Sequence, residues 1–198
     1  MLFYPEDQVV PEKLEADPFL IRPLRATDVE LDYQAVIASR ENLLMRTGGR
    51  WPKVGFTIEE NLSDLEYHEA QHDARNEFTY TVLNMEASEC LGCIYIYPLE
   101  KSLKDSITEE DLASLKIKDY EAYMTCWVIP AAIEQGWDKR LLEVLREWFA
   151  EDWAFTKVVL SFGAAVSPRD LTIPEEIGLP RRFSFETAKG IVIGWQLK

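Results

Sequence analysis

The residues whose types and spacing most directly suggest chemistry are the two histidines of the chain, which stand in the sequence His68-Glu69-x-x-His72. On a helix this spacing places two imidazoles one turn apart, and the glutamate can act as base for a zinc-bound water. Asp73 follows directly, the flanking residues are hydrophilic, and a third ligand would have to be Asp or Glu. We therefore predict a solvated helix face without a metal, and we keep a zinc hydrolase as the third functional hypothesis.

A second pair of ligand-type residues stands in Cys90-x-x-Cys93, inside an alternating apolar segment. Residues three apart on a regular strand point to opposite faces, so these two thiols cannot share a metal ion without a turn. A redox pair would need a following helix, whereas a strand is expected to follow here. Cys126 falls on another expected strand, and we interpret all three thiols as buried apolar groups.

Acidic, aromatic and apolar residues alternate along an expected strand over residues 120–129. One half-polar face, which would line a cleft, holds Glu121, Tyr123, Thr125 and Trp127. A carboxylate in a cleft can take a proton from an amine that is being acylated, so Glu121 is a candidate general base. The simpler interpretation of Glu121 is an exposed carboxylate at the start of a strand.

The segment after this strand has the features of a phosphate-binding turn. Pro130 ends the strand, and an apolar stripe at helical spacing follows from Leu141 to Phe149. Asp138 is expected to cap that helix. Loop amides and the helix N-terminus then converge on one point, as in many anion sites. Lys139 and Arg140 would add positive charge there, unless both are solvated surface residues.

This strand, loop and helix resemble the acetyl-CoA-binding motif of the GNAT family of N-acetyltransferases. The family motif runs Val-x-Pro, then Arg/Gln-x-x-Gly-x-Gly/Ala, then a leucine pair, and the matching positions are Val128, Pro130, Gly136, Leu141 and Leu142. Two positions depart from it, because the Arg/Gln falls on Ile133 and the last small residue falls on Asp138. An aspartate at this place repels a pyrophosphate and competes for the amides.

The resemblance implies that acetyl-CoA is the cosubstrate, with its pantetheine arm along the central strand and its pyrophosphate at the following loop. The cofactor-binding residues would then be Trp127, Val128, Gly136, Asp138, Lys139 and Arg140. The family's tyrosine acid is missing from its usual place, where Pro174 stands, and Tyr95, Tyr97 or Tyr123 would have to replace it. The catalytic residues predicted on this basis are Glu121 and Tyr123.

Composition excludes several classes of protein. The 198 residues have a net charge of −14, which argues against binding nucleic acid or an anionic membrane surface. No apolar run is long enough to span a bilayer, and the N-terminus lacks the pattern of a signal peptide. Three cysteines are too few for a disulfide scaffold, so we expect a cytoplasmic protein.

Periodicity and turn residues predict the order of elements. Strands are expected over 19–24, 78–84, 90–97, 120–129, 157–162, 181–186 and 191–197. Helices are expected over 27–40, 57–75 and 139–149, the first two opened by capping boxes at Thr27 and Thr57. Residues 42–55 and 163–180 are expected to be irregular, and 99–119 an excursion with a short helix after Thr108. This order is similar to that of the GNAT family, with its last helix missing or very short.

We therefore predict one GNAT-like α/β (α+β) domain over residues 1–198, with an N-terminal arm at 1–17. Its mixed central sheet would have about six or seven strands flanked by helices. The leading functional hypothesis is an acyl-CoA-dependent N-acetyltransferase acting on a small-molecule amine or a peptide, with a homodimer left open. The alternative is a GNAT-fold protein without turnover that binds a ligand or a partner.

Overall fold

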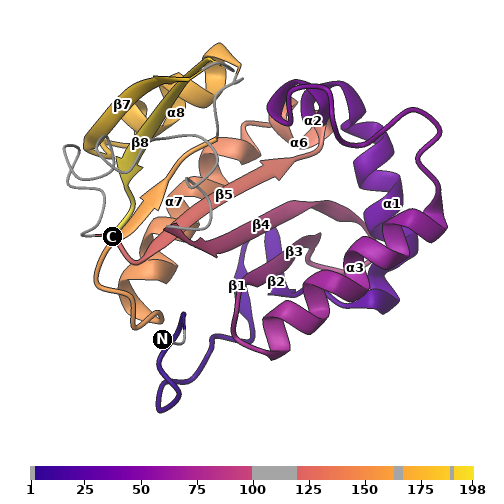
Figure 1. Ribbon diagram of the computed structural model, residues 1–198, viewed down its shortest axis with the longest axis horizontal. Helices are drawn as coiled ribbons and strands as arrows, with labels where there is room; N and C mark the ends of the chain where they lie inside the picture. Colours follow the sequence, from indigo (N-terminus) through magenta and orange to yellow (C-terminus); the bar gives the residue numbers. More distant parts are fainter. Residues whose placement is uncertain (1–2, 100–119, 163–166, 188–189) are drawn as a thin grey trace.

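The described residues form one mixed sheet of eight strands, with helices on both of its faces (Figure 1). The computed structural model describes residues 3–99, 120–162, 167–187 and 190–198. The strands are β1 (Leu14–Ala16), β2 (Phe19–Pro23), β3 (Phe78–Asn84), β4 (Cys90–Pro98), β5 (Ala122–Val128), β6 (Val158–Leu160), β7 (Arg181–Thr187) and β8 (Gly190–Gln196). The helices are the 3-10 turn η1 (Ala26–Asp28), α1 (Val29–Ala38), α2 (Arg40–Arg46), α3 (Ile58–Asp73), α6 (Pro130–Glu134), α7 (Trp137–Glu151) and α8 (Pro168–Glu176).

The predicted α/β class is confirmed, and the sheet has slightly more strands than expected. The additional strand is β1, which lies within the expected N-terminal arm and pairs with β2. Tyr4 of the same segment is fully buried, and its ring packs on Trp153 with 5.4 Å between centroids. Within the described ranges, none of the helices combines the length and the apolar character needed to cross a lipid bilayer.

In the part of the chain that the structure describes, the strand order is β1-β2-β3-β4-β5-β6-β8-β7, and its one parallel pair is β5 with β6. This pairing runs from Ala122 opposite Val158 to Met124 opposite Leu160 and then stops. Strand β5 continues to Val128. The edge of β5 from Cys126 to Val128 is therefore left unpaired by any described strand on its β6 side, and the sheet opens there.

The two faces of the sheet differ in chemistry. On β3, Thr79 lies toward α3, where its hydroxyl is 3.2 Å from Nδ1 of His68. The next residue, Tyr80, lies on the opposite face, where its ring is 5.1 Å from the ring of Trp148 on α7. Residues that are directly paired share a face, so the α3 side also holds Tyr95, Tyr97, Tyr123, Thr125 and Trp127. The predicted apolar stripe of α7 is buried against the other face.

A β-bulge in β4 changes the expected geometry of the cysteine pair. Val82 is opposite Gly92 and Leu83 is opposite Cys90, so Leu91 is an extra residue without a partner. Cys90 and Cys93 consequently lie on one face, and their sulfur atoms and a carboxylate oxygen of Asp32 lie within 4.8 Å of one another. The prediction that the two thiols point to opposite faces is wrong, because it assumed an unbroken alternation.

The cluster of Asp32, Cys90 and Cys93 forms a buried hydrogen-bonded group under α1. The Cys93 thiol donates to Oδ1 of Asp32 at 3.3 Å, and Nδ2 of Asn61 donates to Oδ2 of Asp32 at 3.0 Å. A hydrogen bond with Cys90, together with burial, raises the pKa of Cys93 well above its ordinary value. Burial also raises the pKa of Asp32. These shifts favour a network of protonated groups, which agrees with the interpretation of the thiols as core residues.

Of the two predicted capping boxes, one forms as expected. Thr57 caps α3, where its hydroxyl accepts from the Glu60 amide at 3.3 Å and the Glu60 carboxylate accepts from the Thr57 amide at 3.2 Å. Thr27 does not cap its helix, because it lies inside η1 and α1 begins at Val29. The stretch expected to be a loop over 42–55 begins instead inside α2, which continues to Arg46.

The segment after β6 forms a helix where the sequence predicted irregular chain. Ser167 caps α8 by accepting from the Asp170 amide at 3.2 Å, and Pro168 occupies the first turn, where proline is favoured. Pro174 lies near the end of the helix, where little helix remains to be broken. The last helix that the GNAT resemblance implies is therefore present. The short helix expected after Thr108 falls outside the described residues.

Candidate functional site

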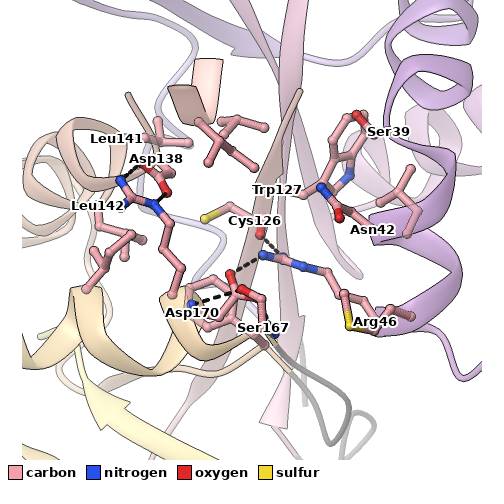
Figure 2. A pocket seen from close by; sticks show the side chains of 17 residues that line it. Ser39, Asn42, Arg46, Cys126, Trp127, Asp138, Leu141, Leu142, Ser167 and Asp170 are labelled. Atoms are coloured by element: carbon pink, nitrogen blue, oxygen red, sulfur yellow. Dashed lines mark hydrogen bonds and ion pairs between the residues drawn. The ribbon is translucent and has the colours of Figure 1, made fainter. Parts of the chain in front are cut away.

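A cavity of about 280 Å³ lies where the sheet opens beyond the last β5–β6 pair. Residues from four helices and two strand ends line it (Figure 2). They include Leu43 and Arg46 of α2, Cys126, Trp127 and Val128 of β5, Asp138, Leu141 and Leu142 of α7, and Arg169, Asp170 and Ile173 of α8. Of the turn and the helix N-terminus that the sequence singled out, Ile133 and Asp138 line this cavity.

Arg46 reaches across this cavity from α2 (Figure 2). Its Nη1 donates to the carbonyl oxygen of Cys126 at 2.5 Å, and its Nη2 donates to the carboxylate of Asp170. The guanidinium also stacks 4.9 Å from the ring centroid of Phe162. Arg46 therefore occupies a backbone acceptor on the unpaired edge of β5 and joins α2 to α8.

Asp138 is held in an ion pair of its own at the N-terminus of α7. Arg169 of α8 donates to both carboxylate oxygens, through Nε to Oδ2 and through Nη2 to Oδ1 at 2.7 Å. This contact raises the pKa of Arg169. The negative charge that the sequence placed against a pyrophosphate is thus offset by a cation from a helix that the sequence did not predict.

The remaining residues of the loop are placed as follows. Gly136 has a left-handed backbone, with φ of 75°, and links the short helix α6 to α7. Lys139 forms an ion pair with Glu176 at 3.0 Å, and Arg140 bonds to the carbonyl of Asp17 at 3.4 Å. Both side chains thus bond to residues outside the lining of the cavity.

A second, larger cavity of about 710 Å³ lies on the α3 face of the sheet. Aromatic side chains form much of its wall, and its polar groups come from α2 and the residues that follow it, from α3, from β5 and from the residue before β3. The lining includes Trp51, Asp64, Tyr67, His68, Glu77, Tyr95, Tyr97, Tyr123, Thr125 and Trp127. The half-polar face predicted for the central strand does line this cavity from Tyr123 to Trp127.

The two cavities meet at four residues that line both: Leu43, Arg46, Trp127 and Phe162. At this junction the indole Nε1 of Trp127 donates to the hydroxyl oxygen of Tyr95 at 3.4 Å. Burial raises the pKa of Tyr95 well above its ordinary value, so its phenol is protonated at neutral pH. A ligand in the first cavity and a ligand in the second would therefore approach each other beside a protonated hydroxyl.

The arrangement of the chain is similar to that of several solved acetyltransferases, although no protein-family model and no curated protein matches its sequence. The ribosomal L7/L12 α-N-protein acetyltransferase RimL, in complex with coenzyme A, superimposes with a TM-score of 0.70 at 14% identity, over 93% of this chain and 97% of that chain. For the ribosomal-protein-S5-alanine acetyltransferase from Vibrio fischeri the TM-score is 0.66 at 13% identity, over 94% and 96%.

The microcin C7 self-immunity acetyltransferase MccE, in complex with acetyl-CoA and AMP, is also similar. Its TM-score is 0.66 at 8% identity, over 96% of this chain and 97% of that chain. The chain has the GNAT fold. Identities this low establish the architecture, and the chemistry of the site has to be argued from its own residues.

Within the GNAT fold of this chain, Glu121 stands apart from both cavities. Its carboxylate accepts from the backbone amides of Thr156 at 2.6 Å and Lys157 at 3.5 Å, and the side chain is exposed. The other predicted catalytic residue, Tyr123, lines the second cavity, and burial raises its pKa. The structure therefore brings Tyr123 together with Trp127 and leaves Glu121 outside both cavities, directly before the first residue of β5.

The His-Glu-x-x-His segment is not the solvated face that the sequence suggested. His72 is buried, with Nδ1 3.2 Å from the carbonyl oxygen and 3.3 Å from the amide of Thr79. Burial lowers the pKa of His72 to about 4. Glu69 forms an ion pair with Arg25 at 3.2 Å and accepts from the amide of Ala26 at 2.7 Å. These groups hold α3 to η1 and β3, which gives the zinc-hydrolase hypothesis no support.

Among the described residues, three charged groups of the first cavity were missed by the sequence reasoning: Arg46, Arg169 and Asp170. The last two follow Ser167-Pro168, and the pattern of Ser, Pro and an acidic residue at the third helical position is a helix-start signal that could have been used. Arg46 belongs to a helix without a clear apolar stripe, and no signal in its neighbourhood connects it with a strand 80 residues away.

Proposed function

We propose that the chain is an acyl-CoA-dependent N-acetyltransferase, with the first cavity for the cofactor and the second for the acceptor amine. The observation that carries this proposal is the meeting of the two cavities at Trp127, beside the Tyr95 hydroxyl. The neighbours RimL and MccE, which were solved with coenzyme A and acetyl-CoA, support the same assignment.

The cofactor would enter along the unpaired edge of β5, where Cys126, Trp127 and Val128 line the first cavity. Its pyrophosphate would meet the turn at Gly136 and the N-terminus of α7, where the helix dipole favours an anion and where the Lys139 amide, now bonded to Asp138 at 2.9 Å, could turn to it. Arg169, which pairs with Asp138 at this end, is the nearby cation that could turn to a phosphate oxygen. Lys139 and Arg140, predicted for this role, are better placed to bond to Glu176 and Asp17.

Acetyl transfer then needs an acid for the leaving thiolate. The neutral amine nitrogen attacks the thioester carbonyl carbon, so that a C–N bond forms and the C–S bond breaks. Tyr95 donates its phenolic proton to the sulfur of coenzyme A, and the proton lost from nitrogen restores the phenol. His68 lines the same cavity, with its ring 5.5 Å from the Tyr95 ring, and could relay that proton. Tyr123 is the second candidate acid.

A second candidate function is a GNAT-fold protein that binds a partner without turnover. The contact that favours it is the bond from Arg46 to the Cys126 carbonyl, because this backbone acceptor lies on the edge that the pantetheine arm would need. The pair of Asp138 and Arg169 likewise occupies the anion site. For acetyl-CoA to bind, both contacts must rearrange or share their partners.

Calorimetric titration with acetyl-CoA, coenzyme A and dephospho-coenzyme A decides between these functions. We expect binding that is weakened in Gly136→Val, because a β-branched residue strains a left-handed backbone. Gly55→Val is the matched control, since Gly55 is also left-handed but lies in the loop before α3, away from the cavity. Acetyl-CoA binding by the wild type together with release of free thiol in the presence of an amine supports the enzyme. An absence of binding in the wild type would leave the non-catalytic protein.

A further inference from the structure

The β-bulge in β4 supplies the turn that a shared metal site at Cys90 and Cys93 requires. On an unbroken strand these two thiols would point to opposite faces, and the extra residue Leu91 brings them to one face. The two sulfur atoms and a carboxylate oxygen of Asp32 lie within 4.8 Å of one another. A Cys-x-x-Cys spacing is common in zinc sites, because one short turn presents two thiolates to the same ion.

The distances within this cluster are close to those between ligands of one tetrahedral zinc ion. Zinc lies about 2.3 Å from a thiolate sulfur and about 2.0–2.2 Å from a carboxylate oxygen. Tetrahedral angles then place two sulfur ligands about 3.8 Å apart, and a sulfur and an oxygen ligand about 3.5 Å apart. Sγ of Cys93 and Oδ1 of Asp32 are separated by 3.3 Å, so these two groups need to move little to bind one ion.

Asn61 of α3 leaves one buried polar atom beside this cluster without a partner. Its Nδ2 donates to Oδ2 of Asp32 at 3.0 Å. Its Oδ1 has no hydrogen-bond partner among the described residues, although only 1% of Asn61 is exposed. A half-turn of the amide exchanges the two atoms and brings the oxygen to the position of Nδ2, next to the Asp32 carboxylate. Asn61 can therefore offer a fourth ligand to an ion held by the other three residues.

The surroundings of the cluster also suit a metal ion. Asp32 is only 3% exposed, and within the described chain its hydrogen bonds come from Asn61 and Cys93, with no lysine or arginine among its partners. A buried carboxylate without a cation is either protonated or bound to a metal ion. The Thr81 hydroxyl lies 3.6 Å from Sγ of Cys90, where it can donate to a thiolate. Hydrogen bonds of this kind orient the ligands of metal sites.

We propose that Asp32, Cys90 and Cys93 bind a structural zinc ion, with Asn61 as the fourth ligand. The ion displaces the two thiol protons and the carboxyl proton, which pass to solvent, and it joins α1 and α3 to β4. Two thiolates favour zinc over magnesium and calcium, which prefer oxygen ligands. Without zinc the same groups keep their protons, in agreement with the raised pKa values of Asp32 and Cys93. None of the four residues lines either cavity, so the site is independent of the proposed acetyl transfer.

The first test measures zinc in the untagged full chain, expressed in zinc-supplemented medium and desalted into a buffer without chelator. We expect about one zinc ion per chain by elemental analysis, and X-ray absorption at the zinc edge should show two sulfur neighbours at about 2.3 Å. Cys93→Ser should lower the zinc content by about tenfold or more, because a thiolate ligand is lost. Cys126→Ser, which removes the third buried thiol outside the cluster, is the matched control and should retain the zinc.

Refolding with other metal ions gives a second measurement. The wild type, unfolded and refolded anaerobically with Co²⁺, should show the cobalt–thiolate charge-transfer band and the visible bands of tetrahedral cobalt. Refolding with Zn²⁺ should give a higher melting temperature than refolding with a chelator, because the ion binds the folded chain.

Three results would overturn the zinc site. The first is substoichiometric zinc in the wild type together with no cobalt–thiolate band after refolding. The second is zinc that remains in Cys93→Ser and is lost in His68→Ala, which would place the ion at the histidines of α3. The third is a chain mass lower by two hydrogen atoms, which would show a disulfide between Cys90 and Cys93. If Cys93→Ser does not fold, the sulfur neighbours counted by X-ray absorption in the wild type decide alone.

Discussion

Replacing Asp138 with alanine should strengthen the binding of acetyl-CoA and of coenzyme A. The change leaves the Arg169 guanidinium without its carboxylate partner at the N-terminus of α7, where we expect the pyrophosphate. Two unit charges about 4 Å apart interact by about 1 kcal/mol in water and by about 4 kcal/mol at an effective dielectric constant of 20. The Asp138 side chain is 16% exposed and the Arg169 side chain is 47% exposed, so the site lies between these limits.

We therefore expect Asp138→Ala to improve the binding free energy by about 1–2 kcal/mol, or about five- to thirty-fold in Kd. Arg169→Ala should weaken binding by a similar amount, because it leaves the Asp138 carboxylate unopposed. The double variant should bind about as tightly as the wild type. Isothermal titration calorimetry of all four proteins, at low salt and at about 0.5 M salt, measures both the effects and their screening.

The directions in which the three variants change the affinity for acetyl-CoA test this electrostatic explanation. Weaker binding in Asp138→Ala would mean that the carboxylate positions the loop or α8, and that its charge is not what limits the affinity. Single-variant effects that are equally large at high salt would point to packing, because an interaction between exposed charges must be screened. Thermal melts of the four proteins exclude a change in binding that comes from unfolding.

Three other predictions follow from residues outside this ion pair. Tyr95→Phe should lower kcat by about a hundredfold or more with little change in the Kd of acetyl-CoA, because the general acid is lost. Tyr123→Phe should lower kcat less. Single-turnover rates of the two variants distinguish these effects. Burial lowers the pKa of His72 to about 4, so the imidazole is neutral in the folded protein at neutral pH. The contribution of His72 to the unfolding free energy is therefore complete above the unfolded pKa near 6.5, and it is lost as the pH falls toward 4. Urea unfolding should show this loss, up to about 3 kcal/mol, and a His72→Gln variant should show a smaller loss over the same pH range. Leu145→Ala should cost about 2–5 kcal/mol of unfolding free energy, since Leu145 is fully buried, and an unchanged melting temperature would refute the assignment of the α7 stripe to the core.

The parts of the fold that the sequence predicted are those governed by local periodicity. Alternation along β5 separated the half-polar face of Tyr123 and Trp127 from the core face, and the helical stripe of α7 identified the helix that covers that core. Thr57 capped α3 because the residues after it continue a helix. The same pattern at Thr27 does not cap α1, because the next residue, Asp28, accepts hydrogen bonds from Arg22 at 2.6 Å and from the Arg25 amide at 2.9 Å.

The parts that were missed depend on contacts between segments far apart in the chain. The bulge at Leu91 is defined by the pairing of β4 with β3, and the alternation of residues along β4 alone does not show how β4 pairs with its neighbour. In the first cavity, Arg46 and Asp170 are 124 residues apart, and Asp138 and Arg169 are 31 apart. The prolines of residues 163–180 argued against a helix in spite of the capping signal at Ser167, so α8 and its cation Arg169 were not predicted.

The position of Cys126 affects the order of events in acetyl transfer. This thiol lines the first cavity, and burial raises its pKa to about 12, so it is protonated at neutral pH. A protonated thiol is a poor nucleophile, so we expect no acetylated Cys126 as an intermediate between donor and acceptor. Because the donor would lie along the edge of β5 and the acceptor on its face, both can be present together. The kinetics of such an enzyme are sequential: double-reciprocal plots at several amine concentrations intersect, and acetyl-CoA alone leaves no label on the protein.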